Sequence, residues 1–117
     1  MNAEGRIPKV SQYGSVDPAP PSQETVVADL AARLCDESLP MFQRMRAVFA
    51  LRNQRTDAAC LALCQGFSSE SALLRHEIAY VLGQMQNTVA LPTLIERLED
   101  GGEHVMVRHE AAEAMGA

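Results

Sequence analysis

The chain repeats its own sequence at intervals of 31 and 33 residues, and this periodicity constrains its fold more than any other feature. The three matching segments are RMRAVFALR from Arg44, RHEIAYVLG from Arg75 and RHEAAEAMG from Arg108. In each segment an arginine precedes small or apolar residues at helical spacing, which predicts one amphipathic helix per repeat. A period of this length is typical of stacked helical hairpins.

The segments between these helices also match one another. The pattern A-x3-L-x3-[F/L] begins at Ala59 and again at Ala90, and it predicts the other helix of each hairpin. Turn-like sequences separate the predicted helices at residues 53–57, 68–71, 86–88 and 100–102. One short helix pair buries too little of its apolar stripe alone, whereas stacked pairs bury it against each other. The sequence therefore predicts an all-α fold, an α-solenoid of HEAT-like helical hairpin repeats.

The periodic region does not include the start of the chain. Residues 1–21 are rich in Pro and Gly and predict a disordered N-terminal lead-in. Ser22 is expected to cap a helix from about Gln23 to Cys35, so HEAT-like repeats are expected over residues 22–117. No capping repeat with a polar outer face follows the third helix, and solenoids need one for solubility. We therefore expect a truncated part of a longer solenoid, or a chain that pairs with another.

Composition narrows the function classes. The formal net charge is −5 and no basic stripe is visible, which argues against nucleic-acid binding. No segment approaches the roughly 20 apolar residues of a membrane helix, and no signal peptide is recognisable; we expect a cytoplasmic protein without membrane contact. The cysteines Cys35, Cys60 and Cys64 are odd in number. We expect them to act as small hydrophobic residues rather than as metal or redox groups.

Two dipeptides, His76-Glu77 and His109-Glu110, occupy the same positions of successive repeats. Stacked repeats place equivalent positions side by side, so these side chains are expected to be neighbours. Imidazole with carboxylate suits non-haem iron, manganese or zinc. The alternative is that both dipeptides are ordinary polar residues on a helix surface. The first repeat carries Met45-Arg46 there, so the fold itself does not require His-Glu.

Other residues are weaker candidates for a site. His104 lies in the loop sequence GGEHV and is expected to be solvated. Arg75 and Arg108 are expected to form helix or loop hydrogen bonds rather than to bind an anion. Tyr80 is expected in the core. Gly83 permits close packing or close approach of a ligand, and we favour packing.

The residues just described resemble a known enzyme family. The stretch ALLRHEIAYVLGQMQ, followed by LPTLIERLED and MVRHEAAEAMGA, closely resembles the N-terminal half of deoxyhypusine hydroxylases, over about residues 25–117. The resemblance implies a HEAT-repeat enzyme in which two related halves each give two His-Glu dipeptides to a di-iron centre. It implies a metal site that draws on His76, Glu77, His109 and Glu110. It also implies that Glu77, Glu110 and Gly83 lie near the substrate.

The same resemblance implies a reaction. Such an enzyme uses dioxygen and two Fe(2+) ions to hydroxylate the deoxyhypusine side chain of the translation initiation factor 5A precursor, which completes hypusine. This chain would supply about half of the ligands, so it is expected to need the missing C-terminal half or a second chain, and to be inactive alone. Two alternatives remain: a non-catalytic HEAT-repeat scaffold that binds a protein partner and, less favoured, a HEAT-like lyase or chaperone of tetrapyrrole attachment.

Overall fold

A computed structural model describes residues 25–116, and the predicted lead-in at 1–21 lies outside the described residues. The described residues form α-helices, two short 3-10 helices and no strand. The elements are α1 (Val27–Cys35), α2 (Met41–Gln54), α3 (Asp57–Gln65), η2 (Gly66–Ser68), α4 (Ala72–Met85), η3 (Thr88–Ala90), α5 (Leu91–Glu99) and α6 (Val105–Gly116). Within this part of the chain, no helix is long and apolar enough to cross a membrane.

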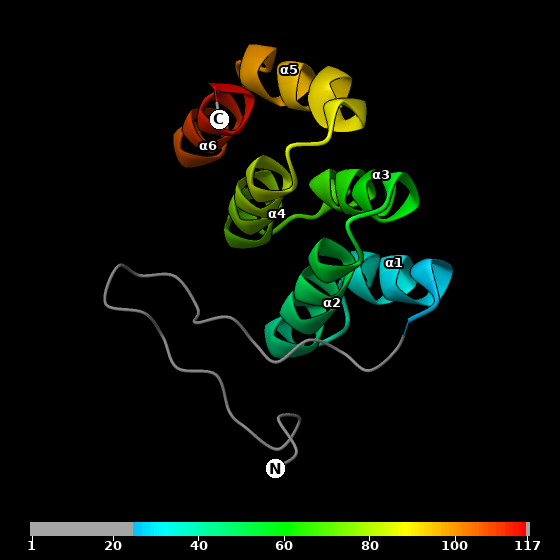
Figure 1. The fold of residues 1–117 in the computed structure, drawn as a ribbon. Helices are drawn as coiled ribbons and strands as arrows, with labels where there is room; N and C mark the ends of the chain where they lie inside the picture. Colours follow the sequence, from blue (N-terminus) through cyan, green and yellow to red (C-terminus); the bar gives the residue numbers. More distant parts are fainter. Residues whose placement is uncertain (1–24, 117) are drawn as a thin grey trace, which may run out of the picture.

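The helices stack in two layers. The second helices of the hairpins, α2, α4 and α6, follow one another along one side, and α1, α3 and α5 lie along the other (Figure 1). Each hairpin therefore contacts its neighbour through equivalent helices, as α4 does with α6. This arrangement confirms the predicted all-α solenoid of helical hairpins.

The core lies between the two layers. Its largest fully buried side chains come from every repeat, and include Leu30, Leu34, Met45, Leu63, Leu74 and Ile78. In α4 the inward stripe contains Leu74, Ile78 and Val81, spaced three and four residues apart as an amphipathic helix requires. The apolar residues that recur at helical spacing in the sequence are thus the residues that are buried in the core.

The helix boundaries follow local chemistry. Thr56 and Ser71 accept hydrogen bonds from backbone N–H groups three residues later, at 3.0 and 3.1 Å, and so cap α3 and α4. The predicted start of the first helix at Gln23 was too early, because Thr25 and Val26 are not helical and α1 begins at Val27. Gln54 donates a hydrogen bond to the Thr25 carbonyl at 2.8 Å, which holds this segment against the end of α2 instead.

The repeated arginines tie the hairpins together. Arg44 and Arg108 each donate from Nε to the backbone carbonyl ten positions earlier, at 2.9 and 3.0 Å. Arg75 donates to the Ser69 carbonyl at 2.8 Å. The predicted hydrogen-bonding role of Arg75 and Arg108 is therefore confirmed, and these bonds fix the start of each second helix.

Candidate metal centre

Helices α4 and α6 each carry one His-Glu dipeptide, and one residue of each dipeptide meets the other between the helices. His76 Nε2 on α4 lies 3.2 Å from Glu110 Oε1 on α6. Both side chains are largely shielded, with 21% and 17% of their area exposed. The predicted adjacency of the two dipeptides is confirmed for this pair.

Glu77 follows His76 on α4 and is buried. It is 6% exposed, which makes it the most buried acidic residue among those described. Burial of a carboxylate is costly unless a hydrogen bond, a cation or a metal compensates it. Glu77 makes such a compensating interaction in the structure.

His109 does not join the His76–Glu110 pair. Its side chain is 63% exposed, and its Nε2 lies 3.6 Å from Glu113 Oε1, one turn further along α6. The stacking of the repeats explains this difference. In the two earlier repeats, the second helix of the next repeat covers the position equivalent to His109. Met45 is buried, and His76 meets Glu110, but among the described residues no further helix covers His109. Accordingly, that part of the chain contains no group of three or more His, Cys, Asp or Glu residues arranged to hold a metal ion.

The His76–Glu110 pair nevertheless fits a metal of the expected kind. Bonds of about 2.1 Å from a metal to nitrogen and oxygen, set at a right angle, place the two ligand atoms about 3.0 Å apart. The measured separation of 3.2 Å is close to this value. Imidazole and carboxylate ligands without thiolate favour iron or manganese over a structural zinc site.

The cysteines belong to the other layer of the solenoid. Cys60 on α3 is fully buried, and burial raises its pKa to about 11. Burial also raises the pKa of Cys35 and Cys64. A thiol with a raised pKa is a poor metal ligand and a poor nucleophile, which agrees with the interpretation of these residues as hydrophobic.

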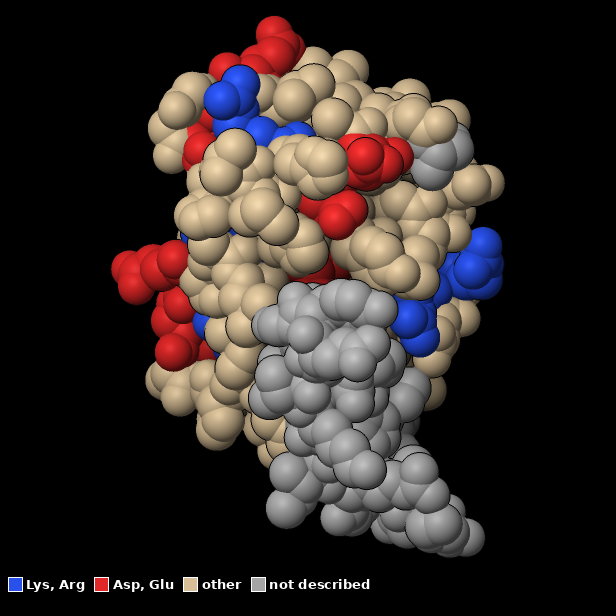
Figure 2. Space-filling model, turned by 90° about the vertical axis from the view of Figure 1, so that its left-hand side faces the viewer, with Lys and Arg blue, Asp and Glu red and all other residues tan. Residues whose placement is uncertain are grey.

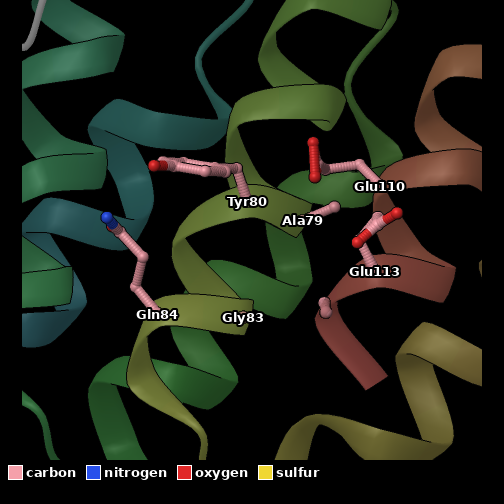
Figure 3. Close-up of a pocket in the computed structure, with 7 residues that line it drawn as sticks. Ala79, Tyr80, Gly83, Gln84, Glu110 and Glu113 are labelled. Carbon is pink, nitrogen blue, oxygen red and sulfur yellow. The ribbon is translucent and has the colours of Figure 1, made fainter. Parts of the chain in front are cut away.

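A groove runs between α4 and α6 beside the His76–Glu110 pair. Its volume is about 260 Å³. Figure 3 shows Glu110 and Glu113 on one side of the groove, Tyr80 and Gln84 on the other, and Ala79 and Gly83 between them. A Cβ atom at Gly83 would lie 3.0 Å from the Ala114 Cα, so the favoured packing role of this glycine is confirmed. Gly83 also lines the groove.

The prediction that Tyr80 lies in the core was wrong. The residue is 48% exposed. Ile78 and Val81 fill the inward stripe of α4, and Tyr80, two residues from Ile78, points about 200° away from it around the helix. The ring is therefore on the groove side of the molecule.

Acidic side chains gather on the face formed by the second helices. Figure 2 shows carboxylates in the middle of this face, between uncharged surfaces, and basic side chains at its margin. Glu110 and Glu113 line the groove, and the described lining includes no Lys or Arg. The groove therefore favours a cationic ligand over an anionic one.

The loop before α6 holds a residue that the sequence interpretation missed. Glu103 is 8% exposed and accepts hydrogen bonds from Arg75 Nη2 at 2.8 Å, from Arg97 Nη1 at 3.2 Å and from the His104 backbone N–H at 2.6 Å. Burial alone would raise its pKa, but these bonds together hold the pKa below its ordinary value of 4.5. His104 is exposed as expected, yet its Nδ1 accepts a hydrogen bond from the Met106 N–H at 3.1 Å at the start of α6. These contacts position the helix that carries His109.

Comparison with known proteins identifies the architecture. A family model described as HEAT repeats matches residues 28–116. A protein named deoxyhypusine hydroxylase from Danio rerio is 55% identical over 105 residues, which is 90% of this chain and 34% of that protein. Its namesake from Homo sapiens is 50% identical over 117 residues, covering 100% of this chain and 39% of that protein.

A solved structure of human deoxyhypusine hydroxylase in complex with glycerol gives a TM-score of 0.84 at 52% sequence identity. The match covers 96% of this chain and 39% of that one. The chain thus spans well under half the length of the relatives it matches. The chain belongs to the HEAT-repeat family, and its sequence and fold match one part of proteins named deoxyhypusine hydroxylase.

Proposed function

We propose that this chain is part of an iron-dependent monooxygenase that hydroxylates the deoxyhypusine side chain of the translation initiation factor 5A precursor to hypusine. One observation carries the proposal: His76 and Glu110 meet at 3.2 Å on neighbouring helices, in a chain about half identical to proteins named for that reaction. The acidic groove beside the pair supports a substrate with a cationic end.

His76 and Glu110 are the residues best placed to hold iron, with Glu77 as a buried inner ligand and His109 joining from α6. The bound Fe(2+) supplies the activation of dioxygen that hydroxylation of a C–H bond needs. The complete enzyme holds two Fe(2+) ions, and this chain supplies about half of their ligands. Its carboxylates also orient the ammonium group of the substrate, because charged hydrogen bonds between the two are strong.

Completion of the site needs further protein against α6, and two comparisons between repeats support this. Gly83 on α4 is packed against Ala114, whereas its equivalent on α6, Gly116, has nothing within 4 Å of a Cβ placed there. Likewise Ala79 is fully buried, whereas its equivalent Ala112 is exposed. The exposed face of α6 thus carries the same small residues that α4 packs against its neighbouring helix.

The arginines support the same conclusion. Arg75 reaches across to Glu103 in the next repeat with three hydrogen bonds of 2.8 to 3.1 Å. Its equivalent Arg108 makes only the bond to the Leu98 carbonyl among the described contacts, which leaves its two terminal nitrogens for an acceptor outside the described residues. A helical hairpin with a carboxylate in its loop would satisfy Arg108 and cover His109.

Counting bound iron tests the metal assignment. The 117-residue chain is loaded with ferrous iron without oxygen, excess iron is removed, and the iron per chain is measured. We expect about one weakly held iron per chain, its loss in His76→Ala, and its retention in His104→Asn, a matched control at an exposed histidine. Two tightly bound irons per chain would contradict the half-site assignment, and equal binding by His76→Ala would contradict the role of His76.

A non-catalytic scaffold is the alternative function. Val105 and Met106, at the start of α6, are 69% and 51% exposed, which favours docking of another protein. The two functions separate in the His76→Ala variant. A scaffold keeps its partner and never binds iron specifically, whereas the proposed oxygenase loses iron.

A further inference from the structure

An ion pair outside the metal ligands joins α4 to α6. Arg75 directly precedes His76 on α4, and Glu103 lies in the loop that leads into α6. The guanidinium donates from Nη2 to Glu103 Oε1 at 2.8 Å and from Nε to Glu103 Oε2 at 3.0 Å. Two parallel bonds of this kind fix orientation as well as distance. The pair therefore holds the starts of the two helices in one arrangement.

The Glu103 side chain is tied to the first turn of α6. It is 2% exposed, and it also accepts hydrogen bonds from Arg97 Nη1 on α5 at 3.2 Å and from the His104 backbone N–H at 2.6 Å. The His104 carbonyl in turn accepts the Val107 and Arg108 N–H groups, both at 3.0 Å. A displacement of Glu103 thus moves the start of α6 with it.

The metal ligands lie between two points at which α4 and α6 are fixed. One point is this ion pair, at the start of both helices. The other is the contact of Gly83 with Ala114 further along, where a Cβ on the glycine would lie 3.0 Å from the Ala114 Cα. His76 and Glu110 meet at 3.2 Å between the two points. Because ligands must be held within about 0.5 Å of their productive geometry, the site depends on both points.

Helices α2 and α4 are joined differently. Glu70 occupies the position of Glu103 one repeat earlier, and it is exposed. Arg44 binds Glu37 of its own repeat at 3.1 Å, and it reaches the next repeat through the Ser69 hydroxyl, also at 3.1 Å. The loop carboxylate thus binds the arginine of the neighbouring helix in the repeat pair that carries both His-Glu dipeptides, and not in the pair before it.

We propose that Arg75 and Glu103 are positioning residues of the metal centre, which set the approach of α6 to α4 so that His76 and Glu110 meet at ligand distance. Neither supplies a ligand, because each acts through the helix that it holds. The inference rests on the proposed function, since the ligands are those of the proposed oxygenase. The effect on the helices needs no metal, so the two can be tested apart.

Two lysine variants separate positioning from stability. Arg75→Lys keeps the charge but loses the paired bonds that a planar guanidinium makes with one carboxylate. Arg97→Lys is the matched control, because Arg97 also binds Glu103 and its side chain is 18% exposed, against 16% for Arg75. Arg97 lies on α5, however, and does not join α4 to α6. Both variants are compared at a temperature at which circular dichroism shows them to be folded.

The first measurement uses the metal-free chain. Amide hydrogen exchange, followed by NMR, measures local opening of α6, and the amides of α2 correct for any change in global stability. In Arg75→Lys we expect the amides of residues 107–110 to exchange about tenfold faster, the effect of losing one hydrogen bond between charged groups. In Arg97→Lys we expect a change of about twofold at most, as for the loss of a weak ion pair.

The second measurement is the affinity for cobalt(II), which imidazole and carboxylate ligands also bind and whose visible absorption depends on their geometry. Arg75→Lys should weaken binding about tenfold, the lower end of the loss that follows replacement of residues orienting metal ligands, and should change the absorption spectrum. Arg97→Lys should bind cobalt(II) as the unmodified chain does.

Three outcomes would overturn the positioning role: unchanged amide exchange in Arg75→Lys, unchanged cobalt(II) affinity in that variant, or equal changes in Arg75→Lys and Arg97→Lys. Cobalt(II) binding that His76→Ala abolishes but Arg75→Lys leaves unchanged refutes the positioning role alone. Equal cobalt(II) uptake by His76→Ala and the unmodified chain refutes the metal site of the proposed oxygenase, and the positioning role with it.

Discussion

Replacement of Glu103 by Gln should destabilise the chain more than replacement of an exposed carboxylate such as Glu96. The Glu103 side chain is 2% exposed and accepts hydrogen bonds from Arg75, Arg97 and the His104 N–H. Gln keeps one acceptor oxygen, but it places an amide N–H₂ group where a guanidinium donates. Both arginines then lose their common counter-charge.

The size of the effect follows from burial. Loss of one partner of a buried ion pair costs about 3–5 kcal/mol. The Arg75 and Arg97 side chains are 16% and 18% exposed, so water partly compensates them. We expect a loss of about 2–4 kcal/mol, and a fall in melting temperature of about 10–30 °C for a domain of this size.

Thermal unfolding followed by circular dichroism at pH 7 measures this effect. The control is Glu96→Gln, which removes the same charge from a side chain that is 73% exposed and lies 3.3 Å from Arg97. An exposed pair contributes about 0–1 kcal/mol, so the control should shift by a few degrees at most. Equal shifts in the two variants would refute the reasoning.

Three further outcomes are expected. The free energy of unfolding should fall as the pH drops below about 4.5, because Glu103 takes up a proton in the unfolded chain at a higher pH than in the folded chain. The stabilisation by ionised Glu103 is complete above that pH and is lost as the pH falls through the lowered pKa of the folded state. This pH dependence should be missing from the acid unfolding profile of Glu103→Gln. Gly83→Ala should lower the free energy of unfolding by about 1 kcal/mol, because crowding against Ala114 costs more than the gain in helix propensity. Gly116→Ala meets no such crowding and should be neutral or slightly stabilising. Chemical denaturation measures both variants, and the opposite order of stability would disprove the packing argument. Cys60, buried and with its pKa raised to about 11, should react with iodoacetamide at pH 8 only after unfolding, as mass spectrometry can measure; rapid labelling of the folded chain would contradict this.

The repeat made much of the fold predictable. Equivalent residues in a solenoid lie side by side, so the alignment of Arg75 with Arg108 was enough to bring α4 against α6 and His76 near Glu110. The same logic predicted the packing role of Gly83. No knowledge of side-chain positions was needed for these conclusions, because periodic stacking fixes which helices are neighbours.

Other features depend on contacts that periodicity does not encode. Tyr80 shares a repeat position with the buried Phe49, yet it is exposed, since its burial depends on the side chains of the neighbouring helices. Glu103 is an apparently ordinary loop residue whose burial follows from two arginines on different helices. His109 repeats the position of His76 without its environment, because burial there comes from the next helix.

The most direct test of the account is the location of iron in the chain. Crystals loaded with ferrous iron without oxygen would be measured at the iron absorption edge, where anomalous scattering marks the metal. The account predicts a peak about 2.0–2.2 Å from His76 Nε2 and from a Glu110 carboxylate oxygen. A peak at His104 or at the cysteines, or ordered crystals with no peak near His76, would contradict it.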